Sequence, residues 1–301
     1  FTGGVPVNAT YTDYADDRSV LEMTGDLKPL LIHIKPFKYE KPVGQDGAAS
    51  LKASLSKGVL KTIEGLQISA PNLSLKDARL TFAPMNGKTA ELAGGVLPSA
   101  TIGRTQVKAD FEVTPKNLLK VSASGSVFDA YPFMQGDDQQ SAVESEKPKN
   151  PLTMMISLSA GQMLTGEDLS LGKTKLYLET DADGDMTRLE MDSVAGVGDI
   201  YLRFKPDATG KRSFRLEAAD AGATLKAFDL YDQVRGGKIL ISGEPRAGTL
   251  RGDIVGTAQM ENFTIVKAPA LAKLLSIMSL TGLGELLNNQ GLAFSKLESD
   301  F

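Results

Sequence analysis

The sequence contains no cysteine and no tryptophan, and His33 is its only histidine. The absence of cysteine excludes a disulfide framework and a thiolate metal site, although it leaves the cellular compartment undecided. With one histidine, a Ser-His-Asp triad or a histidine metal site could be built only around His33. The range of catalytic and metal chemistry open to this chain is therefore narrow.

An excess of positive charge is also missing. The 301 residues include 33 Lys and Arg against 37 Asp and Glu, which gives a net charge of −4. A nucleic-acid-binding protein needs a basic surface, so that class is excluded. No signal peptide is visible, and no apolar run is long enough to cross a bilayer as a helix. Because the chain starts at Phe1 without a methionine, we expect a piece of a longer protein, with any membrane anchor outside it.

What the sequence has in quantity is alternation of apolar and polar residues, the pattern of a strand with one buried face. The alternation recurs along most of the chain, as in 107–113, 200–204 and 239–241. Turn signals such as Asp183-Gly184 separate these runs, and most gaps are too short for a helical crossover. The pattern predicts a mainly β protein, with a long curved antiparallel meander sheet and short helical excursions.

A polar segment at residues 135–151 (QGDDQQSAVESEKPKNP) interrupts the alternation. Its charge and its bounding proline predict a flexible loop. We therefore expect a sheet segment at 1–134, the loop, and a second sheet segment at 152–301. Each sheet segment has a strand followed by a helical excursion, which suggests a repeated unit.

A first helix is expected near residues 220–234. Asp220 is a suitable N-cap, because its carboxylate can accept a backbone hydrogen bond in the first helical turn. Gly236-Gly237 is expected to end the helix, since glycine is common at helix C-termini.

A C-terminal helical pair is expected near residues 269–289. Pro269 suits a first helical position, and apolar residues follow at helical spacing. The pair is apolar on almost all sides, so it should be buried in protein or lie at a membrane surface. Its residues expected to cap the sheet or contact a membrane are Leu271, Leu274, Leu275 and Met278.

Few polar motifs are candidates for a catalytic or metal-binding site. The segment 181–185 (DADGD) resembles part of a calcium loop but lacks the EF-hand register, so a solvated hairpin turn explains it better. His33 alternates with Ile32 and Ile34 and is expected to point to solvent. No nucleophile, paired-carboxylate or metal constellation is found. The chain is expected not to be an enzyme and to need no metal or cofactor.

The remaining candidate site is the apolar face of the sheet itself. A sheet this long must close into a barrel, pair with a second sheet, or curl around a ligand. An aliphatic lining could hold acyl chains, although a slip of one residue in register would invert the set. The residues expected to line it are Leu176, Leu178, Ile200, Leu202, Phe204, Phe214, Leu216, Ile239 and Ile241.

Part of the sequence resembles a known family. The runs 220–238 (DAGATLKAFDLYDQVRGGK) and 263–276 (FTIVKAPALAKLLS), with Leu250-Arg251-Gly252 and 291–294 (GLAF), are similar to AsmA-like proteins of Gram-negative bacteria. The likeness is to the C-terminal region of YhdP-type and TamB-related members. It covers about Phe214–Phe301. Before Pro151, only the alternating pattern of the strands is similar.

The resemblance implies a protein of the cell envelope, anchored in the inner membrane by a helix outside this chain and extending through the periplasm. It implies repeating β-groove units that form a taco-like sheet and carry phospholipid to the outer membrane, as bridge-like lipid transfer. Implied partners are phospholipid, the inner and outer membrane surfaces, and the rest of a longer chain. It brings no catalytic residues. A structural or assembly module of outer-membrane biogenesis, with a filled core, is the alternative.

Overall fold

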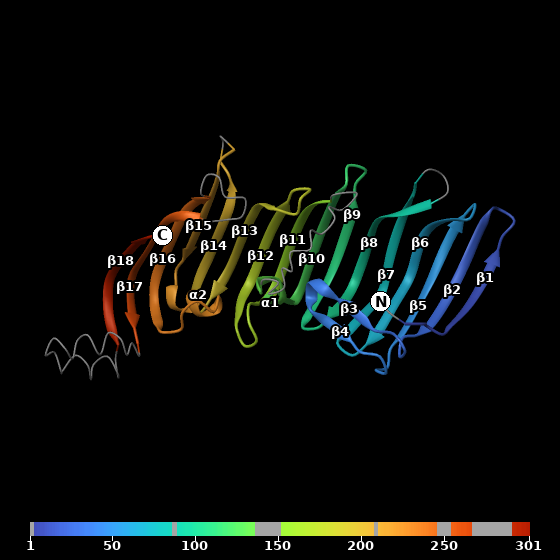
Figure 1. Cartoon of the computed structure of the whole chain (residues 1–301), viewed down its shortest axis with the longest axis horizontal. Coiled ribbons are helices and arrows are strands. Elements are labelled where there is room, and N and C mark those ends of the chain that lie inside the picture. The colour runs from blue at the N-terminus through green and yellow to red at the C-terminus, as the bar shows by residue number, and fades with distance from the viewer. Residues whose placement is uncertain (1–2, 86–88, 136–151, 208–209, 246–253, 267–290) are drawn as a thin grey trace. The chain divides into compact units, whose positions relative to one another are not determined.

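The computed structural model describes residues 3–85, 89–135, 152–207, 210–245, 254–266 and 291–301. Strands dominate the described chain (Figure 1). Sixteen of them form one open sheet, in which neighbours in space are neighbours in sequence except where β3 and β4 form a separate pair. This confirms the prediction of a mainly β antiparallel meander with short helical excursions. The expected helical pair at 269–289, with its residues Leu271, Leu274, Leu275 and Met278, lies outside the described residues.

The chain divides into two compact units. The N-terminal unit comprises Phe1–Gly161 with Thr180–Asp185, and the C-terminal unit comprises Gln162–Glu179 with Met186–Phe301. The boundary falls inside strand β11 (Thr153–Leu164). The separation at the polar segment 135–151 therefore stays a prediction, and the two units are described in turn.

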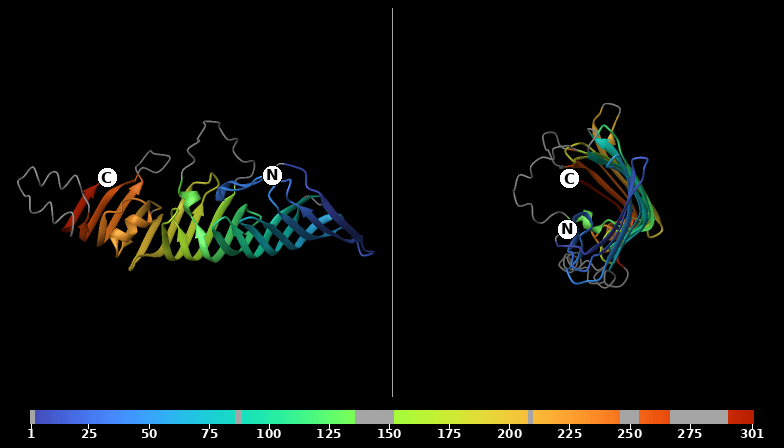
Figure 2. Two further views of the ribbon diagram at one scale, coloured as in Figure 1. Left: turned by 90° about the horizontal axis from the view of Figure 1, so that it is seen from below. Right: turned by 90° about the vertical axis from the view of Figure 1, so that its right-hand side faces the viewer.

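The N-terminal unit is built from hairpins whose strands curve into an arc, seen end-on in Figure 2. Its registers place apolar residues opposite one another, for example Leu21 opposite Ala53, Ala53 opposite Ile63 and Ile63 opposite Leu80. The strands of its sheet, apart from β11, are β1 (Val7–Asp13), β2 (Arg18–Asp26), β5 (Ala48–Ser56), β6 (Val59–Ala70), β7 (Leu73–Met85), β8 (Thr89–Ile102), β9 (Thr105–Val113) and β10 (Leu118–Asp129).

An insertion between β2 and β5 covers the ends of these strands on their apolar side. It holds β3 (Ile32–Ile34), the 3-10 helix η1 (Lys35–Phe37) and β4 (Tyr39–Lys41). Leu27, Leu30, Ile32 and Tyr39 pack with Leu73 in one buried cluster. The ring of Phe37 meets Phe133 of the short helix α1 (Tyr131–Met134) edge to face, with ring centroids 5.3 Å apart.

Lys41 is the polar centre of this insertion. Its side chain is fully buried, and its ammonium group donates to the carbonyl oxygens of Leu27 at 2.8 Å and Leu30 at 3.0 Å. A third contact, to the carbonyl of Pro42, is 3.3 Å long. A buried charge is tolerated only when its hydrogen bonds are satisfied, and three carbonyl oxygens meet that requirement here.

In its described residues, the C-terminal unit continues the antiparallel pattern and has one helix. Its elements are β12 (Ser170–Thr180), β13 (Met186–Ala195), β14 (Gly198–Pro206), β15 (Arg212–Ala218), α2 (Ala221–Ala227), β16 (Val234–Pro245), β17 (Ile254–Ile265) and β18 (Leu292–Asp300).

The acidic segment 181–185 joins β12 and β13 as a hairpin turn. The Asp181 amide donates to the Asp185 carbonyl at 2.9 Å. The Asp181 carboxylate in turn accepts from the backbone amides of Asp183 and Asp185, both at 3.0 Å. The expected turn is confirmed, and Asp181 serves to hold its backbone.

Helix α2 begins as expected and ends earlier than expected. The Asp220 side chain caps it by accepting from the Ala223 amide at 3.0 Å. The expected end at Gly236-Gly237 is wrong, because both glycines lie inside β16. The helix ends instead in a Schellman motif, in which Leu230 N–H donates to Leu225 C=O and Asp229 N–H to Lys226 C=O. Asp229 takes the left-handed conformation, φ 56°, where glycine is usual.

Substitutions at the two ends of α2 should have opposite effects on stability. Asp220→Ala removes the capping bond and should lower the free energy of unfolding by about 1 kcal/mol. Asp229→Gly relieves a left-handed aspartate and should raise it by roughly 0.5–1 kcal/mol. Urea denaturation followed by circular dichroism measures both. Equal and same-signed changes would contradict the assignment of the two helix ends.

Replacing Lys41 should loosen the insertion. Lys41→Met removes the ammonium donor from the Leu30 carbonyl and leaves the Leu27 carbonyl with only the Leu30 amide, so it should cost on the order of 1–3 kcal/mol. Hydrogen exchange of the amides of residues 27–47 should accelerate more than that of the remaining sheet. Lys35→Met, at an exposed position of the same insertion, is the matched control and should change neither quantity.

Candidate functional site

The nine residues expected to line an apolar surface lie on one face of the C-terminal unit. Residues directly opposite in an antiparallel pair point to the same face. Ile200 lies opposite Ala218 and Ala218 opposite Ile239, while Leu202 lies opposite Leu216 and Leu216 opposite Ile241. Phe204 lies opposite Phe214. These pairings place seven of the nine residues together on three adjacent strands, β14, β15 and β16.

Leu176 and Leu178 of β12 belong to the same face. The hydroxyl of Thr174 is 2.8 Å from that of Ser193, and Ser193 lies opposite Ile200. Positions 174, 176 and 178 share a face because alternate residues of a strand point the same way. We call the surface formed by these nine residues the apolar face.

Burial is uneven across the apolar face. Ile200 is fully buried, and Phe204, Leu216 and Ile239 are at most 9% exposed. The remaining five, Leu176, Leu178, Leu202, Phe214 and Ile241, are only half-buried. Protein atoms therefore cover part of this face and leave the rest partly accessible.

Helix α2 lies against one end of these strands. It packs against β16 and approaches the β13–β14 turn closely: a Cβ at Gly198 would stand 2.5 Å from the Asp220 backbone nitrogen. The Thr165 hydroxyl donates to the Ala227 carbonyl and holds the other end of the helix. The 7 residues of α2 extend about 10 Å, whereas the 12 residues of β16 extend about 40 Å. The helix is too small to cover the strands along their length.

The opposite face is charged. Arg188 pairs with Glu190, and Arg203 pairs with Asp192 and lies 3.6 Å from Glu190. The Arg188 guanidinium also stands 5.1 Å from the centre of the Tyr177 ring. The hydrogen bond from Arg188 holds the pKa of Glu190 below its ordinary value of 4.5. We call this the polar face.

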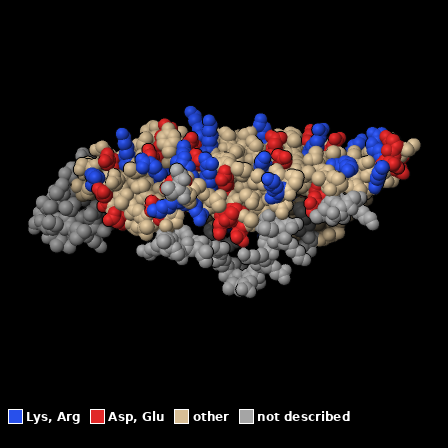
Figure 3. Space-filling model, turned by 90° about the horizontal axis from the view of Figure 1, so that it is seen from above, with Lys and Arg blue, Asp and Glu red and all other residues tan. Residues whose placement is uncertain are grey.

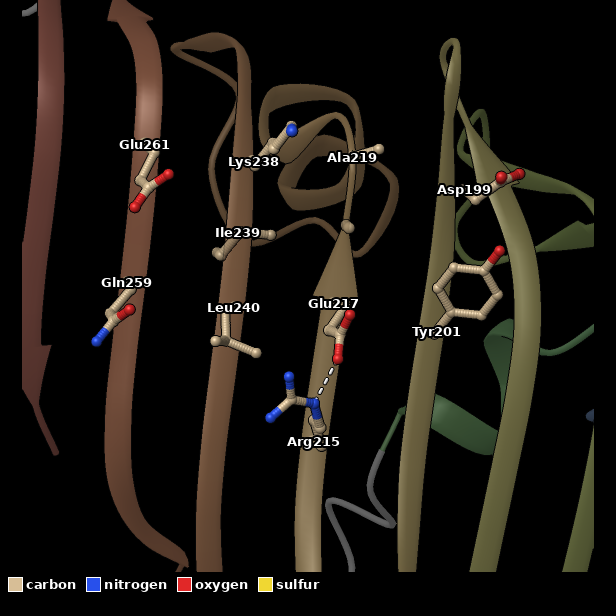
Figure 4. A pocket seen from close by; sticks show the side chains of 11 residues that line it. Asp199, Tyr201, Arg215, Glu217, Ala219, Lys238, Ile239, Leu240, Gln259 and Glu261 are labelled. Carbon is tan, nitrogen blue, oxygen red and sulfur yellow. Dashed lines mark hydrogen bonds and ion pairs between the residues drawn. The ribbon is translucent and has the colours of Figure 1, made fainter.

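A shallow hollow of about 400 Å³ opens on the polar face. Tyr201, Arg215, Glu217, Lys238 and Glu261 lie around it, with α2 behind the sheet (Figure 4). Both charge signs are present, and Arg215 and Glu217 pair with each other. Figure 3 likewise shows acidic and basic side chains interspersed over the surface that it presents. With Asp199, the lining has three acidic and two basic side chains, a mixture that does not strongly favour an ionic ligand of one sign.

The N-terminal unit also has an apolar face, whose residues were not among the predicted site residues. Leu80 lies opposite Gly95, and Gly95 opposite Phe111. A Cβ at Gly95 would stand 2.6 Å from the Phe111 ring, so this glycine makes room for the ring. The alternation was visible in the sequence. The half-buried residues of this face are Leu21, Leu51, Ile63, Leu80, Phe111 and Val121.

The other polar candidates are not brought together. His33 is exposed on β3, with Ile32 buried beside it, as expected. Across the described residues, no three His, Cys, Asp or Glu side chains are grouped so that they could hold a metal ion. None of the described helices has the length and apolar character needed to cross a membrane.

Comparison of the chain with protein-family models, with curated proteins and with solved structures finds no match.

The polar face should respond to acid through Glu190. The pKa of Glu190 is lower in the folded protein than its ordinary value of 4.5. The ionised carboxylate therefore stabilises the fold fully above pH 4.5, and this stabilisation is lost as pH falls through the folded pKa. Arg188→Met should therefore lower stability more at neutral pH than in acid, and should raise the pKa of Glu190. Urea denaturation across pH and carboxyl NMR titration check this. Lys175→Met, an exposed site on β12, should show no such pH dependence.

Proposed function

We propose that this chain is a non-enzymatic carrier of phospholipid, whose acyl chains lie along the apolar face of the sheet. The supporting observation is that the sheet bears apolar side chains on one side and ion pairs on the other, and that Leu202, Phe214 and Ile241 on the apolar side are only half-buried. An extended hydrocarbon chain fits a long aliphatic strip better than a compact polar ligand does.

Hydrophobic burial supplies enough free energy for such binding. Each methylene removed from water contributes about 0.8 kcal/mol, so a chain of a dozen methylenes gives on the order of 10 kcal/mol before ordering costs. Leu202, Phe214 and Ile241 also lose exposed apolar area when a chain covers them. No polar contact is required, because the headgroup can remain in water.

The proposed setting follows from the resemblance of 214–301 to AsmA-like proteins. In this proposal the chain works in the periplasm, held to the inner membrane by a segment outside it, and passes phospholipid between inner and outer membranes. The residues that would contact acyl chains are the five half-buried ones of the apolar face, Leu176, Leu178, Leu202, Phe214 and Ile241.

A structural or assembly role is the second candidate. It is favoured by the burial of Ile200, Phe204, Leu216 and Ile239 within the protein itself. In that case the rest of the apolar face would pack against protein, and no lipid would bind.

Phospholipid should co-purify with the chain, and adjacent substitutions on opposite faces provide the test. Ile241 and Leu240 are neighbours on β16, both half-buried, with Ile241 on the apolar face and Leu240 on the polar face. Ile241→Asp should reduce bound phospholipid roughly tenfold or more, because covering a carboxylate with hydrocarbon costs more than about 1.4 kcal/mol. Leu240→Asp should leave it unchanged. Native mass spectrometry measures bound lipid.

Leu202→Asp and Leu216→Asp extend the test to β14 and β15, with Tyr201→Asp as the polar-face control. Circular dichroism must show folded protein for each variant. Absence of phospholipid from the unsubstituted chain, or equal loss from both faces, would contradict the proposal and favour the structural role.

A further inference from the structure

Strand β18 of the C-terminal unit is the last in the order of the described sheet. Among the described strands, β18 is paired only with β17. Gly256 and Phe301 exchange both backbone hydrogen bonds, each 3.0 Å long. In an antiparallel pair such residues alternate with residues whose amide and carbonyl groups point away from the partner. The register then places the outward backbone groups of β18 at Lys296, Glu298 and Asp300.

The two sides of this edge differ in chemistry. Lys296 and Glu298 lie opposite Glu261 and Gln259, so their side chains are on the polar face. They form an ion pair of 2.8 Å, and each side chain is about half exposed. Leu297 lies opposite the buried Met260, and its side chain is 43% exposed. A strand added here must therefore offer a charged pair on one side and an apolar residue on the other.

We propose that β18 pairs antiparallel with β18 of a second copy of this chain, about a two-fold axis between the two Leu297 residues. In that register Lys296 of each copy lies opposite Glu298 of the other, and the two Leu297 side chains meet. A two-fold axis perpendicular to the sheet keeps the polar faces on one side and the apolar faces on the other. The two C-terminal units then share one apolar face.

Neighbouring registers are less favourable. With the axis one residue earlier, Lys296 would lie opposite Lys296, and with the axis one residue later, Glu298 would lie opposite Glu298. Like charges directly opposite are destabilising. The axis at Leu297 opposes Lys296 and Glu298 on both sides of it and places no two like charges directly opposite each other.

The other edge strand, β1 of the N-terminal unit, is a poorer partner. Tyr14 N–H donates to Arg18 C=O, so the outward backbone groups of β1 are those of Val7, Ala9, Tyr11 and Asp13. Their side chains lie on the apolar side, since Tyr11 is opposite Leu21. Antiparallel pairing of β1 with β18 would place these residues beside Lys296 and Glu298 and mix the two faces. A parallel pairing would match the faces but would oppose no unlike charges.

A single cysteine tests the axis directly, because the chain has none of its own. Across a non-hydrogen-bonded antiparallel pair the Cα atoms are about 4.5 Å apart, within reach of a disulfide. Leu297→Cys should therefore give an intermolecular disulfide under mild oxidation. Ser295→Cys, two residues away on the same strand and exposed, would face Ser299 of the second copy. It should cross-link roughly tenfold more slowly.

Two further variants separate edge pairing from collision or misfolding. Glu298→Pro removes an outward amide without touching the hydrogen bonds to β17. Introduced into the Leu297→Cys protein, it should reduce cross-linking to the rate of Ser295→Cys. Lys296→Glu should weaken the dimer in sedimentation equilibrium, and Lys296→Glu with Glu298→Lys should restore it.

Equal cross-linking at positions 295 and 297, or a doubly reversed variant no better than Lys296→Glu, would overturn the proposal. Cross-linking between Tyr11→Cys and Leu297→Cys proteins, without Leu297 self-linking, would overturn it in favour of pairing between β1 and β18. Circular dichroism of each variant must match that of the unsubstituted chain.

Discussion

Alternate residues of a strand point to opposite faces, so the hydrogen-bonded register between strands decides which side chains share a face. In the C-terminal unit, Leu202 opposite Leu216 and Arg203 opposite Arg215 belong to one register. A slip of one residue would place Leu202 opposite Arg215 and Arg203 opposite Phe214, which mixes charged and apolar side chains on both faces. The apolar face, the ion pairs on the polar face and the chemistry of the β18 edge all depend on this register.

The elements that depart from the meander rest on polar contacts. The insertion between β2 and β5 is centred on the buried ammonium of Lys41, and α2 is fixed by Asp220 at one end and Thr165 at the other. Such hydrogen bonds orient the short helix α2, and in the insertion they add to the buried apolar cluster around Leu73. Each element covers strand ends within its own unit, and residues such as Leu202 and Ile241 stay half-buried.

Strand alternation was strong enough in the sequence to predict the antiparallel meander and to place Leu202, Leu216 and Ile241 on one face. The cap at Asp220 was also predicted, since its signal is local. The end of α2 was not, because Asp229 supplies a left-handed conformation usually provided by glycine. The role of Lys41 was hidden as well. Lysine in a strand is normally a solvent-facing residue, and only the tertiary positions of three carbonyl oxygens make it a buried one.

The hydrogen bonding of the few polar groups on the apolar face determines which ligands this face can bind. The hydroxyls of Thr174 and Ser193 bond to each other, and Ser193 also donates to the Gly172 carbonyl at 3.0 Å. Among the described residues, no buried side-chain nitrogen or oxygen lacks a hydrogen-bond partner. A ligand therefore need not supply donors or acceptors at set positions. Such a surface discriminates by apolar area and shape, so in the proposed function it would accept acyl chains of differing length and leave headgroups unselected.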